Sequence, residues 1–156
     1  MKRLLFLCLL AAMAPAAAAP VPPHYVSLRA DRANMREGPS YQHRILWVYK
    51  HKGYPLQVLG AYDIWRRVRA ADGTTGWMSA SMLSDQRTVL VTGQGRAPLY
   101  ADPEARARIV AYAMPGAIAR LDACVLRSCR IGATGLKGWI DKDRIWGVEP
   151  GEVFKK

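Results

Sequence analysis

The sequence predicts an all-β protein made of two small barrels in tandem. Three observations indicate this fold class: short strand-like runs alternate with turn residues, no stretch shows sustained helical periodicity, and the pattern occurs twice along the chain. The length of 156 residues allows one ordinary domain or two small ones and excludes a large multidomain enzyme. Because 51% of the residues are hydrophobic, the chain is also unlike a disordered basic tail.

Residues 1–19 have the pattern of an export signal peptide. Lys2 and Arg3 form a positive n-region, residues 4–13 form an apolar h-region, and residues 14–19 are small residues that offer several A-x-A cleavage frames. The apolar run is shorter than the roughly 20 residues that span a bilayer. The leader therefore predicts a periplasmic or secreted protein with no transmembrane span.

Cleavage is expected after Ala18 in preference to Ala19, since Pro20 would otherwise begin the mature chain. Two alternatives are less favoured: an uncleaved anchor, and lipidation at Cys8, which follows a bulky leucine inside the apolar run. The formal charge is +11 for the whole chain and +9 for the mature part, with 21 basic against 12 acidic residues. The basic charge is thus a property of the folded region.

In the first copy, strands are expected at residues 33–35, 45–49, 56–62, 65–69 and 75–78. Glycine, proline and polar residues separate these runs and mark turns. Within residues 65–69, Val68 points to one face of the strand, while Trp65, Arg67 and Arg69 point to the other. This alternation places an aromatic ring and two cations on the same face.

The mature chain keeps two cysteines, Cys124 and Cys129, between strand-like residues 118–123 and 130–132. In an oxidising compartment, this pair is expected to form a disulfide that clips a hairpin across its loop. The chain-entropy model gives about 2 kcal/mol for so short a ring. Half of a zinc site is the rival interpretation, but all three histidines precede the cysteines. No metal and no cofactor are therefore expected.

A comparison of the two halves supports an internal repeat with an offset that drifts from 64 to 62 residues. The matched positions are Glu37-Gly38-Pro39 with Ala101-Asp102-Pro103, Arg44-Ile45 with Arg108-Ile109, Gly53 with Gly116, Val68 with Ile131, Gly76-Trp77-Met78 with Gly138-Trp139-Ile140, and Leu83 with Ile145.

The first copy resembles the bacterial SH3-like domains of exported proteins. Residues 34–40, read as N-M-R-E-G-P-S, are similar to the opening N-[VM]-R-x-G-P-S of that family. Residues 65–68 resemble its W-x-[KR]-V strand, and residues 72–78 its closing G-x-x-G-W turn and strand. The resemblance implies that each copy is an SH3-like barrel.

The second copy is similar but departs from this pattern. Its opening reads Ala97-Pro98-Leu99-Tyr100, and Ser128 occupies the position of Trp65. The expected organisation is a signal peptide at 1–19, a first domain at 25–87, a linker at 88–96 and a divergent second domain at 97–150. The resemblance places the cysteine pair in the second domain, which is expected to be a structural partner.

The resemblance implies recognition of peptidoglycan or its peptide stems by the first domain. Arginine side chains could hold the carboxylates of a wall peptide, and aromatic rings could stack on its sugars. The residues expected to bind this ligand are Arg36, Tyr41, Trp65, Arg67, Arg69 and Trp77.

Structural roles compete with these assignments. Trp77 and Trp139 fit a core position better than a surface one, whereas Trp65 fits a surface groove better. Arg36 could equally brace the turn at Gly38-Pro39.

Other function classes find less support in the sequence. No catalytic motif is present, and no histidine lies in the second copy to activate a cysteine, so no enzymatic activity is expected. The basic charge with interleaved aromatics fits nucleic acid, but export directs the protein to the anionic cell envelope instead. The alternative to wall binding is a periplasmic adaptor for a peptide or an acidic envelope protein. The sequence does not indicate an oligomeric state.

Overall fold

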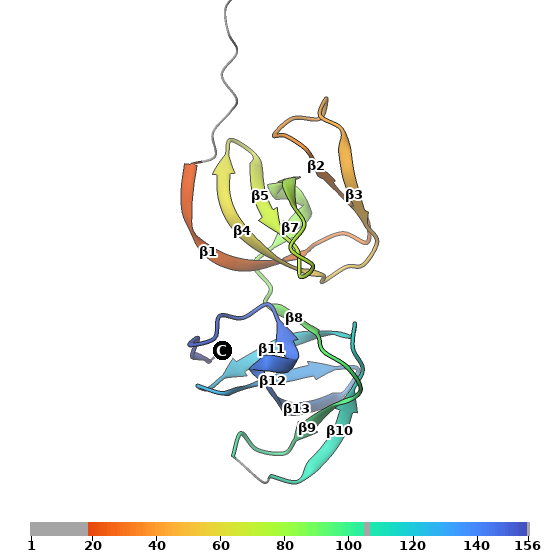
Figure 1. Ribbon diagram of the computed structural model, residues 1–156, viewed down its shortest axis with the longest axis vertical. Helices are drawn as coiled ribbons and strands as arrows, with labels where there is room; N and C mark the ends of the chain where they lie inside the picture. The colour runs from red at the N-terminus through yellow and green to blue at the C-terminus, as the bar shows by residue number, and fades with distance from the viewer. Residues whose placement is uncertain (1–18, 105–106, 156) are drawn as a thin grey trace, which may run out of the picture.

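The computed structural model describes residues 19–104 and 107–155. Figure 1 shows two β units, one above the other. The described residues form β-strands and two short 3-10 turns with no α-helix among them, which confirms the all-β fold class. Accordingly, none of the described segments is a helix with the length and hydropathy of a membrane span. The predicted export leader, apart from Ala19, lies outside the described residues.

The first unit is an antiparallel sheet with its own hydrophobic core. Its hydrogen-bonded order is β3 (Ile45–Tyr49), β2 (Ala33–Arg36), β6 (Thr75–Ser79), β5 (Trp65–Arg69), β4 (Pro55–Tyr62), β1 (Ala19–Leu28) and β7 (Leu83–Ser84). The 3-10 turn η1 (Ala80–Met82) joins β6 to β7. Alternate residues of these strands point inward, and the core contains Leu28, Met35, Leu56, Val58, Val68 and Met78. All five strands predicted for this copy form, with each end within one residue of the prediction.

The second unit repeats the same arrangement. Its order is β10 (Ile109–Ala113), β9 (Ala97–Tyr100), β13 (Leu136–Asp141), β12 (Ser128–Ala133), β11 (Ile118–Cys124), β8 (Thr88–Val91) and β14 (Ile145–Trp146), with β15 (Phe154–Lys155) paired to β11. The 3-10 turn η2 (Lys142–Arg144) precedes β14. The core of this unit includes Val89, Val91, Leu99, Leu121, Ile131 and Ile140.

The structure differs from the sequence prediction at both ends of the second domain. Residues 88–96 were expected to be a linker, but they contain β8, which pairs with β11 and β14. The run Thr88–Val91 is rich in β-branched residues and is mostly buried, so it supplies the first strand of the second sheet. Residues 151–155, beyond the expected end of the domain, continue into β15.

The predicted disulfide is confirmed. Cys124 and Cys129 face each other at the end of the β11–β12 ladder, with their Cα atoms 4.0 Å apart and their sulfurs bonded. Both residues are buried in the second core, and Phe154 pairs with Cys124 from the other side of β11. The bond therefore fixes both the hairpin loop and the strand that receives the C-terminal segment.

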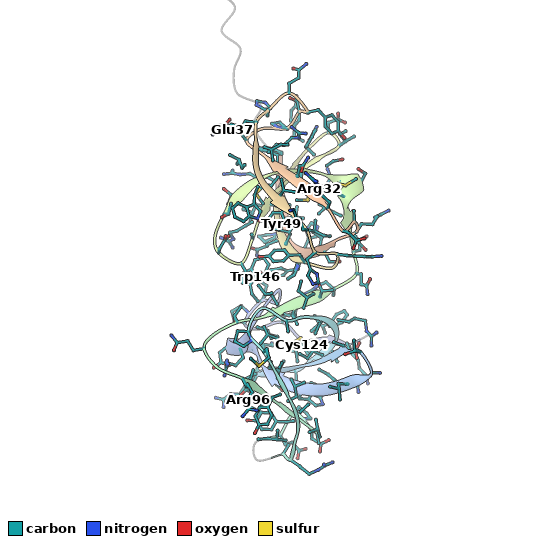
Figure 2. The ribbon with its side chains drawn as sticks, turned by 90° about the vertical axis from the view of Figure 1, so that its right-hand side faces the viewer. Arg32, Glu37, Tyr49, Arg96, Cys124 and Trp146 are labelled. Atoms are coloured by element: carbon teal, nitrogen blue, oxygen red, sulfur yellow. A yellow bond between two sulfur atoms is a disulfide. The ribbon has the colours of Figure 1, made fainter. Side chains whose placement is uncertain are left out.

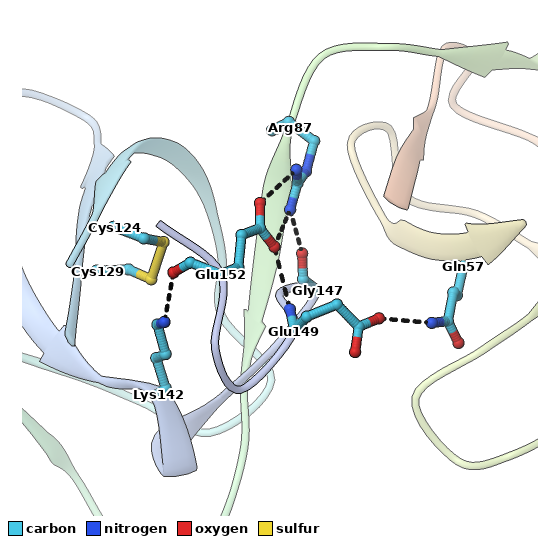
Figure 3. A network of polar contacts seen from close by, with 8 residues as sticks. All are labelled: Gln57, Arg87, Cys124, Cys129, Lys142, Gly147, Glu149 and Glu152. Carbon is cyan, nitrogen blue, oxygen red and sulfur yellow. Dashed lines mark hydrogen bonds and ion pairs between the residues drawn. A yellow bond between two sulfur atoms is a disulfide. The ribbon is translucent and has the colours of Figure 1, made fainter. Parts of the chain in front are cut away.

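A network around Arg87 ties the C-terminal segment to the start of the second unit (Figure 3). Arg87 donates hydrogen bonds to both carboxylate oxygens of Glu152, at 2.8 and 3.1 Å, and to the carbonyl of Gly147, at 2.9 Å. The backbone N–H of Glu149 also donates to Glu152, at 3.0 Å. Lys142 donates to the carbonyl of Glu152, at 2.6 Å. The segment after β14 is thus held by charged hydrogen bonds.

The same region contacts the first unit. The Gln57 side chain donates to the Glu149 carboxylate at 2.8 Å, as Figure 3 shows. Tyr25 packs edge-on against Trp146 with ring centroids 5.2 Å apart, and Figure 2 shows Trp146 at the junction of the two units. The guanidinium of Arg87 lies 5.7 Å from the Tyr25 ring. Burial, with a contribution from Glu149, raises the pKa of Tyr25 to about 12.

Candidate functional site

The first unit has a hollow between the start of β2, the loop that follows β2, the start of β5 and η1. We call it the first hollow. Its volume is about 240 Å³, and its lining consists of Arg32, Ala33, Asn34, Arg36, Tyr41, Trp65, Ser79 and Met82. Two of these residues carry guanidinium groups, and no lining residue carries a carboxylate. The hollow therefore favours an anionic group.

Trp65 lies at the floor of the first hollow, but it is not the exposed groove tryptophan that was expected. Only 4% of its surface is exposed. The loop after β2 folds over it, and Tyr41 packs against the indole with ring centroids 4.9 Å apart and an interplanar angle of 66°. Tyr41 itself is 65% exposed, so this ring offers the accessible aromatic surface.

Arg36 braces the loop that covers Trp65. Its Nη1 donates to the backbone carbonyls of Tyr41, at 2.9 Å, and His43, at 2.8 Å, and its guanidinium lies 5.6 Å from the Tyr41 ring. The bracing role considered from the sequence is therefore confirmed, although the bonds go to residues beyond Gly38-Pro39. Since Arg36 also lines the first hollow, the residue that shapes the loop presents a cation to the site.

Asn34 contributes a polar atom that lacks a partner. Its Oδ1 is buried and accepts no hydrogen bond within the part of the chain that the structure describes. Leaving a buried acceptor unpaired costs about 1–3 kcal/mol of desolvation free energy. A ligand N–H or O–H that enters the first hollow would recover this cost. The first hollow thus combines an unpaired hydrogen-bond acceptor, Asn34 Oδ1, with the positively charged side chains of Arg32 and Arg36.

Three predicted ligand residues lie outside the first hollow. Arg69 donates to the Gln57 side-chain oxygen, and Gln57 in turn contacts Glu149 of the second unit, so Arg69 supports the contact between the units. Arg67 pairs with Trp77 on the β5–β6 ladder, and neither lines the hollow. Trp77 is only 8% exposed, as the core interpretation expected. Trp139 was expected in the core as well, but it is partly exposed.

Five lining residues were missed from the sequence, and Arg32 and Asn34 are the two of them that carry the chemistry of the hollow. Asn34 was accessible to the same argument as Arg36, because the two residues are two positions apart in β2, whereas Arg32 lies just before that strand. Figure 2 shows the Arg32 side chain on the first unit. The depth of the hollow was not accessible, since it depends on how the loop after β2 folds.

The two sheets have the same strand order, and each places a 3-10 turn before a short strand, β7 or β14, at the end of that order. This architecture defines a tandem SH3-like protein. The model of one family, described as the bacterial SH3 domain, matches residues 29–85 and again residues 93–147. The chain belongs to the bacterial SH3 domain family.

Several solved structures are similar to this chain at a low level. NlpC2 from Trichomonas vaginalis has a TM-score of 0.37 and 17% identity, with 80% of this chain and 48% of that chain covered. NlpC1 from the same organism has a TM-score of 0.37 and 18% identity, with 88% and 50% covered. An NlpC/P60 family protein from Bacillus cereus has a TM-score of 0.36 and 15% identity, with 78% and 55% covered. The chain thus spans about half the length of these structures. No curated protein matches it.

Proposed function

We propose that the protein is a non-catalytic, exported binding module that recognises peptidoglycan or its peptide stems at the first hollow. The observation that carries this proposal is the combination of groups in one place. Arg32 and Arg36 supply cations, Asn34 supplies an unpaired buried acceptor, and Tyr41 supplies an exposed ring. Membership of the bacterial SH3 domain family adds support, because such domains commonly bind wall peptides.

The chemistry of a wall peptide fits these groups one by one. A free carboxylate can accept charge-assisted hydrogen bonds from a guanidinium. A backbone amide of the peptide can donate to the Asn34 oxygen. A methyl group or a sugar face can pack on Tyr41, which covers Trp65. Each part of the first hollow thus has a matching part in the ligand.

Export and the absence of catalysis belong to the same proposal. The leader pattern and a disulfide in the fold both favour an oxidising compartment, so the protein would act in the periplasm or outside the cell. Cys124 and Cys129 are bonded to each other, and neither sulfur is available as a thiolate nucleophile.

The mass of the mature protein from the periplasm tests the leader: cleavage after Ala18 is expected, and a full-length chain would contradict it.

Sedimentation with purified peptidoglycan sacculi tests the ligand. We expect the mature protein to pellet with sacculi at low salt, and Arg32→Ala to weaken this binding by roughly tenfold, as loss of a charged hydrogen bond implies. Arg67→Ala is the matched control, since it removes the same charge from an exposed site outside the first hollow. No binding at low salt, or equal losses in both variants, would overturn the proposal.

A second candidate function is peptide or protein binding at a sheet edge. Strand β3 lies at the edge of the first sheet, and its Ile45, Leu46 and Trp47 are 42%, 38% and 58% exposed. An extended peptide of an envelope protein could add to such an edge. Under this alternative, Trp47→Lys abolishes binding of the envelope peptide, while Arg32→Ala still binds it. The opposite result would exclude β3 as the binding edge.

A further inference from the structure

The second unit has a hollow at the position that corresponds to the first one, and we call it the second hollow. Its volume is about 290 Å³, and its lining consists of Tyr100, Asp102, Pro103, Glu104, Arg127, Ser128, Trp139 and Asp141. The strand ladders establish the correspondence. Ser128 pairs with Asp141 as Trp65 pairs with Ser79, and Tyr100 pairs with Trp139 as Arg36 pairs with Trp77. The two hollows are thus the same feature of a repeated fold.

The charge of the second hollow is opposite to that of the first. Asp102, Glu104 and Asp141 provide three carboxylates, against the single guanidinium of Arg127. Salt bridges within the described residues involve none of these four side chains. An excess of negative charge is therefore concentrated in one depression on a strongly basic protein. A cluster of this sign attracts a cation and opposes the carboxylates that suit the first hollow.

An independent feature of the second hollow also indicates a ligand. Ser128 is only 5% exposed, and its Oγ is buried without a hydrogen-bond partner in the described part of the chain. This residue replaces the large indole of Trp65 on the floor of the first hollow. The serine is much smaller than the indole, and its hydroxyl keeps an unused acceptor site. The second hollow thus has a buried polar atom without a protein partner in a lining that also holds three carboxylates.

Two aromatic side chains form part of the wall of the second hollow. Tyr100 and Trp139 face each other on the β9–β13 ladder, and both line the second hollow. Aromatic faces attract cations and pack against methylene groups. A bare metal ion is a poorer fit, because no group of three or more histidine, cysteine or acidic residues in the described ranges is placed to hold one.

We propose that the second hollow binds a primary ammonium group at the end of an aliphatic side chain, as in a lysine-type residue of a peptide. The three N–H donors of the ammonium meet the carboxylates and the Ser128 hydroxyl, while its methylene groups lie along Tyr100 and Trp139. The second unit is then a binding domain in its own right. This assignment does not depend on what the first hollow binds.

The test is an NMR titration of the whole mature protein with two small probes. Nα-acetyl-L-lysine amide carries the ammonium, and Nα-acetyl-L-norleucine amide has a similar stem without the charge. We expect saturable shifts of the Trp139 indole N–H signal with the lysine probe alone. Equal shifts with both probes, or none with either, would overturn the assignment. Sacculus binding is not part of the readout, so failure here is distinct from failure of the proposed function.

Variants locate the site. Asp141→Asn is expected to weaken lysine-probe binding by roughly tenfold, the scale of a charge-assisted hydrogen bond. Asp143→Asn is the matched control, because it removes the same charge two residues away from an exposed position outside the second hollow. Equal affinities for the two variants would show that the carboxylates act only through overall charge.

Ser128→Ala separates binding from folding. Removal of an unpaired buried hydroxyl is expected to leave the unfolding temperature unchanged or higher while it weakens the lysine probe several-fold. Unchanged affinity with raised stability would show that Ser128 is no ligand.

Discussion

Asn34 and Ser128 are polar residues on the inner surfaces of corresponding hollows, and each keeps a buried oxygen without a protein partner. Natural cores satisfy the great majority of such atoms, so an exception calls for a physical reason. A ligand that donates a hydrogen bond would supply one in each unit. At the scale of single residues, the sequence grouped Arg36 and Tyr41, and the structure brings both to the first hollow, while their role in ligand binding stays a prediction. It could not reveal the unpaired oxygens, because those depend on what surrounds each side chain.

Asn34→Ala should separate stability from binding. The change removes an acceptor whose desolvation is uncompensated, so we expect the free energy of unfolding to stay constant or to rise by about 1 kcal/mol. Binding to sacculi should fall several-fold at the same time. Urea denaturation and sedimentation with sacculi measure the two effects. A loss of stability with unchanged binding would assign Asn34 a purely structural role.

At the scale of strands, the glycine-tryptophan motif has the same packing role in both units. Gly76 in β6 and Gly138 in β13 lie where the neighbouring strand comes closest. A Cβ added at Gly76 would meet the Met35 side chain and approach the carbonyl oxygen of Arg36 to 2.9 Å, and one at Gly138 would lie 2.7 Å from the Leu99 Cβ. Neither glycine has a left-handed backbone conformation. Gly76 is needed because β2 leaves no room for a side chain, and Gly138 is needed because β9 leaves none.

Strand prediction succeeded where turn residues bounded a short run, as for residues 45–49 and 65–69, and alternation supported the second of these. It failed for β1 and β8. Burial does not alternate in these strands, since residues 25–28 and 88–89 are buried in succession. Neither strand forms a hairpin with the strand next to it in the chain. Their pairing joins residues distant in sequence, so tertiary contacts determine it.

Gly76→Ala is predicted to destabilise the first unit by about 1–3 kcal/mol, the usual cost of overpacking against backbone that cannot move freely. Gly151→Ala is the control, because no atom lies within 4 Å of a Cβ built there. Thermal unfolding followed by the near-ultraviolet circular dichroism of the tryptophans measures the difference. Equal stabilities of the two variants would mean that β2 and β6 separate more easily than the packing implies.

At the scale of the whole molecule, the repeat was evident from the sequence because matched turn and core residues kept a nearly constant offset. The contact between the units was not evident. Glu149 lies far along the chain from Gln57 and Arg69, and none of the three belongs to a motif, yet they form one hydrogen-bonded series across the junction. Arg69 was predicted to be a ligand residue because strand alternation places it on the face of Trp65, and the sequence does not distinguish an arginine that contacts a glutamine from one that contacts a ligand.

The attachment of the C-terminal segment to the second unit should depend on pH through Glu152. Burial acts to raise the pKa of the Glu152 carboxyl, but hydrogen bonds from Arg87 and from the Glu149 backbone outweigh it and hold the pKa below its usual value. A carboxyl with a lowered pKa in the folded state stabilises the protein above its unfolded pKa, near 4.5, and loses that contribution as the pH falls through the folded value. The side chains of Arg87 and Glu152 are only 21% and 19% exposed, so this ion pair is mostly buried.

Glu152→Gln should therefore lower the free energy of unfolding by about 1–3 kcal/mol at pH 7. The difference from the wild type should shrink as the pH falls below about 4.5. Urea denaturation of both proteins between pH 7 and pH 3 measures this. Glu37→Gln is the control, because the Glu37–Arg44 pair is exposed and 3.7 Å apart, and such pairs contribute little. A difference that stays constant over the whole pH range would show that Glu152 acts through its shape and neutral hydrogen bonds, and that its charge does not hold the C-terminal segment to the second unit.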